Sequence, residues 1–82
     1  MNDLIRNIDK LHTTEPGVTR IKRNLSIDTE DVVLWCRMRI LDETACIERK
    51  GKNWYVTIDD CIITVNAHSY TIITAHKLKT KS

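Results

Sequence analysis

The sequence has 82 residues, of which 41% are hydrophobic and 29% are charged, and its formal net charge is +2. This length suits one small domain, and the composition is that of a folded protein rather than a disordered chain. The longest apolar run, residues 32–36, is too short for a membrane helix, and the residues after Met1 lack the features of a secretory signal. We therefore expect one cytoplasmic domain over residues 1–82, without membrane association.

Three segments of the N-terminal half have the apolar spacing of amphipathic helices. The first covers about 3–12. The run Thr13-Thr14-Glu15-Pro16 combines an N-cap candidate with an early proline, and so predicts a second helix that ends near Leu25. Asp28 is the expected N-cap of a third helix over about 29–41. The predicted helical part therefore covers about 3–41.

From about residue 45 the apolar spacing changes toward two, and isoleucine, valine, threonine and aromatic residues become frequent. Four strands are predicted, over about 45–50, 54–58, 61–66 and 70–76. The short turns between them require antiparallel neighbours. The predicted fold is α+β, with about three N-terminal helices packed on one face of a four-stranded antiparallel β-meander that covers about 45–77.

Alternation along the central strands separates a core face from an outer face. The core face is predicted to hold Trp54, Val56, Ile58, Cys61, Ile63 and Val65. The outer face would then show Tyr55, Thr57, Ile62, Thr64 and Asn66, with His68 in the following turn. For the last strand two sets stay open: Tyr70, Ile72, Thr74 and His76, or Thr71, Ile73, Ala75 and Lys77. Hydroxyls, amides and a tyrosine on an open sheet face suit RNA contact, and an ordinary solvated sheet face is the alternative.

Positive charge gathers in three parts of the chain. The groups are Arg20, Lys22 and Arg23; Arg49, Lys50 and Lys52; and Lys77, Lys79 and Lys81. If they share one face, they form a patch that attracts phosphate and favours RNA as the partner. The alternative is that each group is simply a solvated part of the surface.

The cysteines indicate neither a disulfide scaffold nor a metal site. Cys36, Cys46 and Cys61 are odd in number and widely spaced, and no C-x-x-C pair occurs. We expect three reduced thiols, and no metal or cofactor.

Several segments carry a resemblance to a known family. They are NIDKLHTTE at 7–15, RIKRNL at 20–25, DVV at 31–33 with WC at 35–36, KGKNWYV at 50–56 and ITVNAHSYTIITAHK at 63–77. Together they resemble a family of small stand-alone bacterial proteins, a domain of unknown function. The resemblance covers nearly the whole chain and implies a bacterial, cytosolic setting without an established activity.

A second, more distant resemblance concerns architecture. Helices with an R-I-x-R-type segment and an acid-capped D-V-V helix, followed by a meander that ends in I-I-T-A, are similar to the RelE, barnase and colicin-type ribonuclease toxins. That resemblance implies RNA cleavage without metal on the open sheet face. It would make Arg20 and Arg23 phosphate clamps, and Thr74 and His76 catalytic groups.

Three functions follow from these patterns. The sequence favours a non-catalytic RNA-binding or translation-associated module. The enzymatic alternative is a metal-independent endoribonuclease toxin, in which His76 supplies the acid–base chemistry. The third is a protein-interaction domain, such as a homodimer joined through its sheet edge or through Trp35 and Tyr55.

Overall fold

The structure, a computed structural model that describes residues 3–78, has helices first and strands afterwards. Its helical elements are α1 (Asp3–Arg6), the 3-10 helix η1 (Ile8–Lys10), α2 (Glu15–Leu25) and α3 (Val32–Ile40). The strands are β1 (Cys46–Lys50), β2 (Asn53–Ile58), β3 (Cys61–Asn66) and β4 (Ile72–Lys77), and they form one antiparallel sheet in the order β1-β2-β3-β4. The predicted α+β fold with a four-stranded meander is confirmed.

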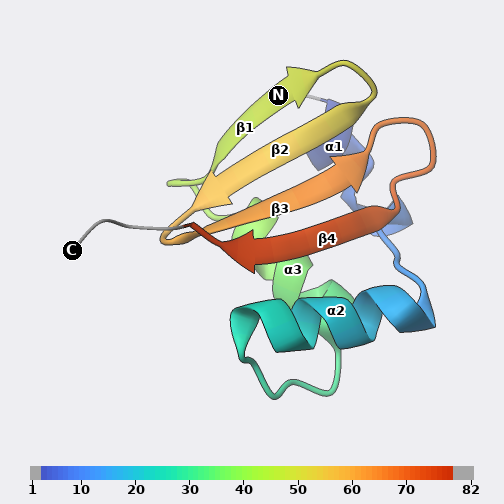
Figure 1. Cartoon of the computed structure of the whole chain (residues 1–82). Helices are drawn as coiled ribbons and strands as arrows, with labels where there is room; N and C mark the ends of the chain where they lie inside the picture. Colours follow the sequence, from blue (N-terminus) through green and yellow to red (C-terminus); the bar gives the residue numbers. More distant parts are fainter. Residues whose placement is uncertain (1–2, 79–82) are drawn as a thin grey trace.

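The helices leave one face of the sheet open. Figure 1 shows α1 and α3 behind the sheet and α2 along its β4 side, with no described helix in front of the strands. We call this uncovered side the outer face. No helix within residues 3–78 combines the length and apolar character needed to cross a bilayer.

The core lies between the sheet and the helices, as alternation predicts. Its buried side chains from the sheet include all six predicted core residues, Trp54, Val56, Ile58, Cys61, Ile63 and Val65. From the helical half they are Leu4, Leu11, Ile21, Leu25, Val32, Cys36 and Ile40. The removal of this apolar surface from water is the main force that holds the helices on the sheet.

The first predicted helix is wrong as one continuous element. It is interrupted at Asn7, whose backbone has φ −115° and ψ 26° and whose side-chain amide donates to the Asp3 carbonyl at 2.9 Å. Asparagine competes in this way with the helical hydrogen bonds. Beyond η1 the chain becomes extended, and His12 forms a parallel bridge with Thr71. This bridge covers part of the free edge of β4.

The two longer helices begin at side-chain caps. The Thr14 hydroxyl accepts the Gly17 amide at 3.1 Å and begins α2, as predicted. The predicted cap of α3 is wrong, because Asp31 and not Asp28 accepts the Leu34 amide, at 2.9 Å. Residues 27–31 are needed as a connection from α2, and the helix begins only at buried Val32.

A register shift in β4 settles which of its side chains face the core. Val65 pairs with Ile72 and Thr64 pairs with Thr74, so Ile73 is an extra residue in β4. Such a β-bulge interrupts strict alternation. As a result Ile72 and Ala75 are both buried, although they belong to different predicted sets. The predicted start of this strand at 70 is also wrong, because Tyr70 lies in the turn with φ +59°.

Candidate nucleic-acid interface

Two rows of side chains cross the outer face. The register places Glu48, Tyr55, Thr64 and Thr74 in one row, and Cys46, Thr57, Ile62 and His76 in the next. Residues opposite each other in antiparallel strands project from the same face. The bulge is therefore what brings Thr74 and His76 to the side that also carries Tyr55.

A stripe of α2 borders this face on the β4 side. Pro16, Thr19, Arg20, Arg23 and Asn24 line a shallow groove of about 340 Å³. Asn24 donates a 3.4 Å hydrogen bond from Nδ2 to the Thr74 hydroxyl. This contact joins the groove to the outer face at the strand that carries His76.

The guanidinium groups of the two arginines in the groove are available to bind an anion. Arg20 and Arg23 are exposed and lie one helical turn apart. Within residues 3–78, neither forms an ion pair; the ion pairs found there are Arg6–Asp3 and Lys50–Glu48. Guanidinium groups bind phosphate in a bidentate manner, so unpaired arginines at this margin suit a phosphate backbone.

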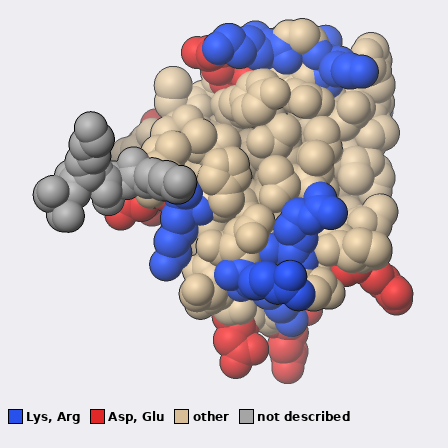
Figure 2. Space-filling view, in the orientation of Figure 1, with Lys and Arg blue, Asp and Glu red and all other residues tan. Residues whose placement is uncertain are grey.

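The second basic group lies at the opposite side of the face. Figure 2 shows lysine and arginine side chains along α2 and, at the other edge, beside the β1–β2 hairpin, with a largely uncharged surface between them. Lys50 has its Nζ 3.9 Å from Oε1 of Glu48, and Lys52 is exposed in the hairpin turn. The predicted basic groups thus flank the outer face instead of merging into one patch.

Three of the predicted phosphate contacts lie elsewhere. Arg49 pairs with Trp54 and packs over its ring at 5.4 Å, on the side that faces the helices, while its Nε donates to the Gly51 carbonyl at 2.9 Å. Lys77 pairs with Cys61 and lines a pocket on the helix side. Lys22 is half-buried and does not line the α2 groove. Lys79 and Lys81 are outside the described residues.

The residues predicted for the outer surface are less accessible to a ligand than the sequence suggests. Thr64 projects outward but is only 7% exposed. The Asn66 side-chain oxygen accepts the amides of His68 and Ser69, at 2.9 and 3.0 Å, and so stabilises the β3–β4 turn. Tyr55 is half-buried, and its hydroxyl accepts a 3.4 Å hydrogen bond from Nδ2 of the Asn53 side chain. The ring of Tyr55 is therefore available on the outer face for stacking. His68 is exposed in the turn between β3 and β4.

The predicted catalytic residues share the outer face, but of the two only Thr74 has a side-chain hydrogen-bond partner within residues 3–78. Thr74 and His76 are two residues apart in β4, which places their Cα atoms roughly 7 Å apart. His76 is exposed, and no hydrogen bond or ion pair to another residue of 3–78 orients its ring. His12, by contrast, has both ring nitrogens engaged, with Thr71 at 3.0 Å and the Lys10 carbonyl at 2.9 Å. Nothing in the sequence signalled this contact, because the two partners are 59 residues apart.

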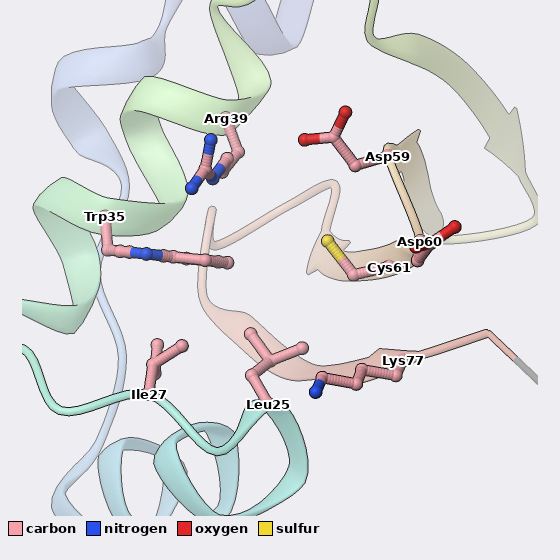
Figure 3. A pocket seen from close by; sticks show the side chains of 8 residues that line it. All are labelled: Leu25, Ile27, Trp35, Arg39, Asp59, Asp60, Cys61 and Lys77. Atoms are coloured by element: carbon pink, nitrogen blue, oxygen red, sulfur yellow. The ribbon is translucent and has the colours of Figure 1, made fainter.

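A separate pocket of about 230 Å³ opens on the helix side of the molecule. Figure 3 shows its lining: Leu25, Ile27, Trp35, Arg39, Asp59, Asp60, Cys61 and Lys77. Arg39 packs over the Trp35 ring at 4.7 Å, and side chains of both charge signs surround the hollow. Burial raises the pKa of Cys61, so its thiol is protonated at neutral pH and is a poor nucleophile. Within residues 3–78 no cluster of His, Cys, Asp and Glu side chains is arranged to hold a metal ion.

Comparison with known proteins identifies the family of the chain. No curated protein matches it, and no solved structure does. The similarity to ribonuclease toxins therefore gains no support from either comparison. A family model matches residues 5–76, nearly the full length, and the predicted membership in a family of unknown function is confirmed. The chain belongs to the family described as "Protein of unknown function (DUF3781)".

Proposed function

We propose that this protein is a non-catalytic RNA-binding module that takes up a single-stranded segment across its outer face. The observation that carries the proposal is the hydrogen bond from Asn24 to Thr74, 3.4 Å long. At this contact the α2 groove, with Arg20 and Arg23, lies beside the β4 margin of an uncovered, largely uncharged sheet.

The surface supplies the groups that RNA recognition uses. The two arginines suit backbone phosphates, and the face of Tyr55 suits a stacked base. Hydroxyls on the same face, such as that of Thr57, suit the ribose 2′-hydroxyl. Four strands spaced about 4.8 Å apart place the β1 and β4 margins about 14 Å from each other. A strand that crosses the sheet would meet the arginines at one margin and Lys50 at the other.

Within residues 3–78 the outer face has no acid–base pair held in position for proton transfer, and this favours binding over cleavage. Metal-free RNA cleavage needs a general base and a general acid on either side of the phosphate. His76 is the histidine that β4 carries on the outer face, and no neighbour within residues 3–78 orients its ring.

The test is binding of a short fluorescein-labelled single-stranded RNA of mixed sequence, followed by fluorescence anisotropy at several salt concentrations. We expect the affinity to fall steeply with salt, because phosphate contacts release counterions. The double variant Arg20→Gln/Arg23→Gln should weaken binding and lower the slope of log K against log salt by about 1.4, since two phosphate contacts are lost. DNA of the same sequence should bind more weakly if 2′-hydroxyls are read.

A matched control removes two positive charges that do not line the α2 groove. Arg6 is exposed in α1, and Lys10 is exposed in η1, where its Nζ lies 5.8 Å from the centre of the Tyr70 ring. The variant Arg6→Gln/Lys10→Gln has the same net charge as the test variant and should bind almost as tightly as the parent. Equal losses in the two variants, or no binding at low salt, would contradict the proposal. Shortened RNA on a denaturing gel would instead favour the ribonuclease.

A further inference from the structure

Helix α3 carries apolar side chains on two opposite sides, with Arg37 and Arg39 between them. Val32, Cys36 and Ile40 face the core and are buried. On the opposite side, Leu34, Met38 and Leu41 are 48%, 63% and 46% exposed. We call these three residues the α3 ridge. A helix at the surface of a monomer normally has a polar outer side.

The spacing of the ridge is that of a short coiled-coil seam. Steps of four and then three residues separate Leu34, Met38 and Leu41, which correspond to heptad positions d, a and d. Arg37 then occupies position g. Asp42 lies beyond the end of α3 at Ile40, but its amide donates to the Arg39 carbonyl at 3.2 Å, so it continues the last turn and corresponds to position e. These two positions flank the seam and determine which helix orientation is favoured.

The flanking charges select one arrangement of two identical helices. In a parallel pair, position g of one helix faces the following position e of its partner, so Arg37 meets the partner's Asp42 in both directions. In an antiparallel pair, position g faces position g, and two Arg37 side chains would repel each other. The ridge is therefore complementary to a second copy in parallel orientation.

The state of Arg37 in the single chain agrees with this pairing. Its side chain is half-buried and forms no ion pair within residues 3–78. The Asp42 carboxylate is exposed, and one oxygen, Oδ1, accepts the Thr44 amide and hydroxyl at 2.8 and 2.6 Å. Its second oxygen is therefore available to an arginine, and charge-assisted bonds of this kind are stronger than neutral ones.

We propose that the α3 ridge is the interface of a two-fold homodimer in which the α3 helices pack in parallel. The contact is small, because nine residues of helix are only about 14 Å long. The expected dissociation constant is therefore high, on the order of 0.1 mM. Because α3 lies behind the sheet, dimer formation leaves the outer face of each copy uncovered (Figure 1).

The first test is sedimentation of the full chain from about 0.01 to 1 mM, a range that brackets the expected dissociation constant. The mass should rise toward that of two chains as concentration increases. Met38→Glu should raise the dissociation constant more than about tenfold, because a charge then lies at the centre of the seam. The matched control is Ile73→Glu, which changes an apolar side chain that is 37% exposed on β4 and should leave dimerisation unchanged. Circular dichroism checks that both variants are folded.

The second test exchanges the flanking charges and distinguishes parallel from antiparallel pairing. Arg37→Glu alone and Asp42→Arg alone each place like charges together in the parallel dimer, so each should be monomeric. In an equimolar mixture both contacts become attractive, and a heterodimer should form. A mass of one chain over the whole range would overturn the proposal, as would a Met38→Glu variant that dimerises like the parent. Dimerisation of Asp42→Arg at the parent's strength would overturn the parallel arrangement.

Discussion

The hydroxyl of Thr13 donates a 2.8 Å hydrogen bond to the carbonyl of Ile72, and so joins the start of α2 to the first residue of β4. Gly17 lies directly beside this bond. It is buried in the first turn of α2, and a Cβ at this position would collide with the Thr13 hydroxyl oxygen. The helix that carries the predicted RNA-binding arginines is therefore docked on the sheet through a contact that has room for glycine only.

Gly17→Ala should destabilise the protein, although alanine is the better helix former. The added methyl displaces the Thr13 hydroxyl from Ile72 and leaves a partly buried carbonyl without its partner. We expect a loss of about 1–3 kcal/mol in the free energy of unfolding, which urea titration measures. Thr19→Ala, at an exposed position of the same helix, is the control and should change stability by less than about 0.5 kcal/mol. A Gly17→Ala variant more stable than the parent would contradict the close contact.

The cap of α3 distinguishes two aspartates that the sequence alone does not. Asp31→Ala removes the acceptor of the Leu34 amide and should lower the free energy of unfolding by about 1 kcal/mol. Asp28→Ala should have little effect, because Asp28 is exposed and does not cap the helix. Thermal melting of the two variants side by side is the measurement. The reverse order of stabilities would place the helix start at the earlier aspartate.

The buried thiol of Cys36 predicts a loss of stability at alkaline pH. Burial, aided by the nearby Cys61, raises the pKa of Cys36 from 9.0 to about 12. The folded chain therefore keeps this proton when the unfolded chain has lost it. The contribution of the protonated Cys36 thiol to the free energy of unfolding is fully present below about pH 9 and disappears as the pH rises toward 12. Over this range the free energy of unfolding should fall by up to about 1.4 kcal/mol per pH unit.

Urea unfolding at several pH values above 8 measures this slope under reducing conditions. Cys36→Ala should flatten it, whatever the variant's stability at neutral pH. Cys46 is exposed, so Cys46→Ala is the matched control and should retain the slope of the parent. If the parent and Cys36→Ala lose stability in parallel, the thiol of Cys36 is not responsible.

The sequence determined most of the sheet because its signals are local. The alternation in β2 and β3 and the short turns predicted six core residues and the order of the strands. The predicted second strand begins one residue too late, at 54, because the turn between β1 and β2 consists of residues 51–52 and Asn53 is already in β2. This shorter turn pairs Arg49 with Trp54 and places it away from the outer face. The break at Asn7 and the choice of Asp31 depend on competition between similar local signals, which a pattern of residue types does not resolve.

The candidate site depended on contacts between distant parts of the chain. No local pattern marks the bulge at Ile73, yet it decides that Thr74 and His76 face outward and that Lys77 faces the helix-side pocket. The contact between Asn24 and Thr74 joins residues that are 50 positions apart in the sequence, and it depends on how α2 packs against β4. The sequence could therefore predict that Arg20 and Arg23 share a helix side, but not which margin of the sheet they border.

The role of His76 separates RNA binding from RNA cleavage. Its ring is exposed on the outer face and lacks a partner within residues 3–78 that would position it for proton transfer, so we expect no cleavage of the RNA probe by the parent protein. His76→Ala should bind RNA within about threefold of the parent, because phosphate contacts provide most of the affinity. His68→Ala, which changes an exposed histidine of the β3–β4 turn, is the control and should behave in the same way. A denaturing gel of end-labelled RNA, incubated with each protein in the presence of a chelator, gives the decisive reading. Cleavage by the parent and by His68→Ala but not by His76→Ala would make His76 a catalytic residue, and the non-catalytic function proposed for this surface would be wrong.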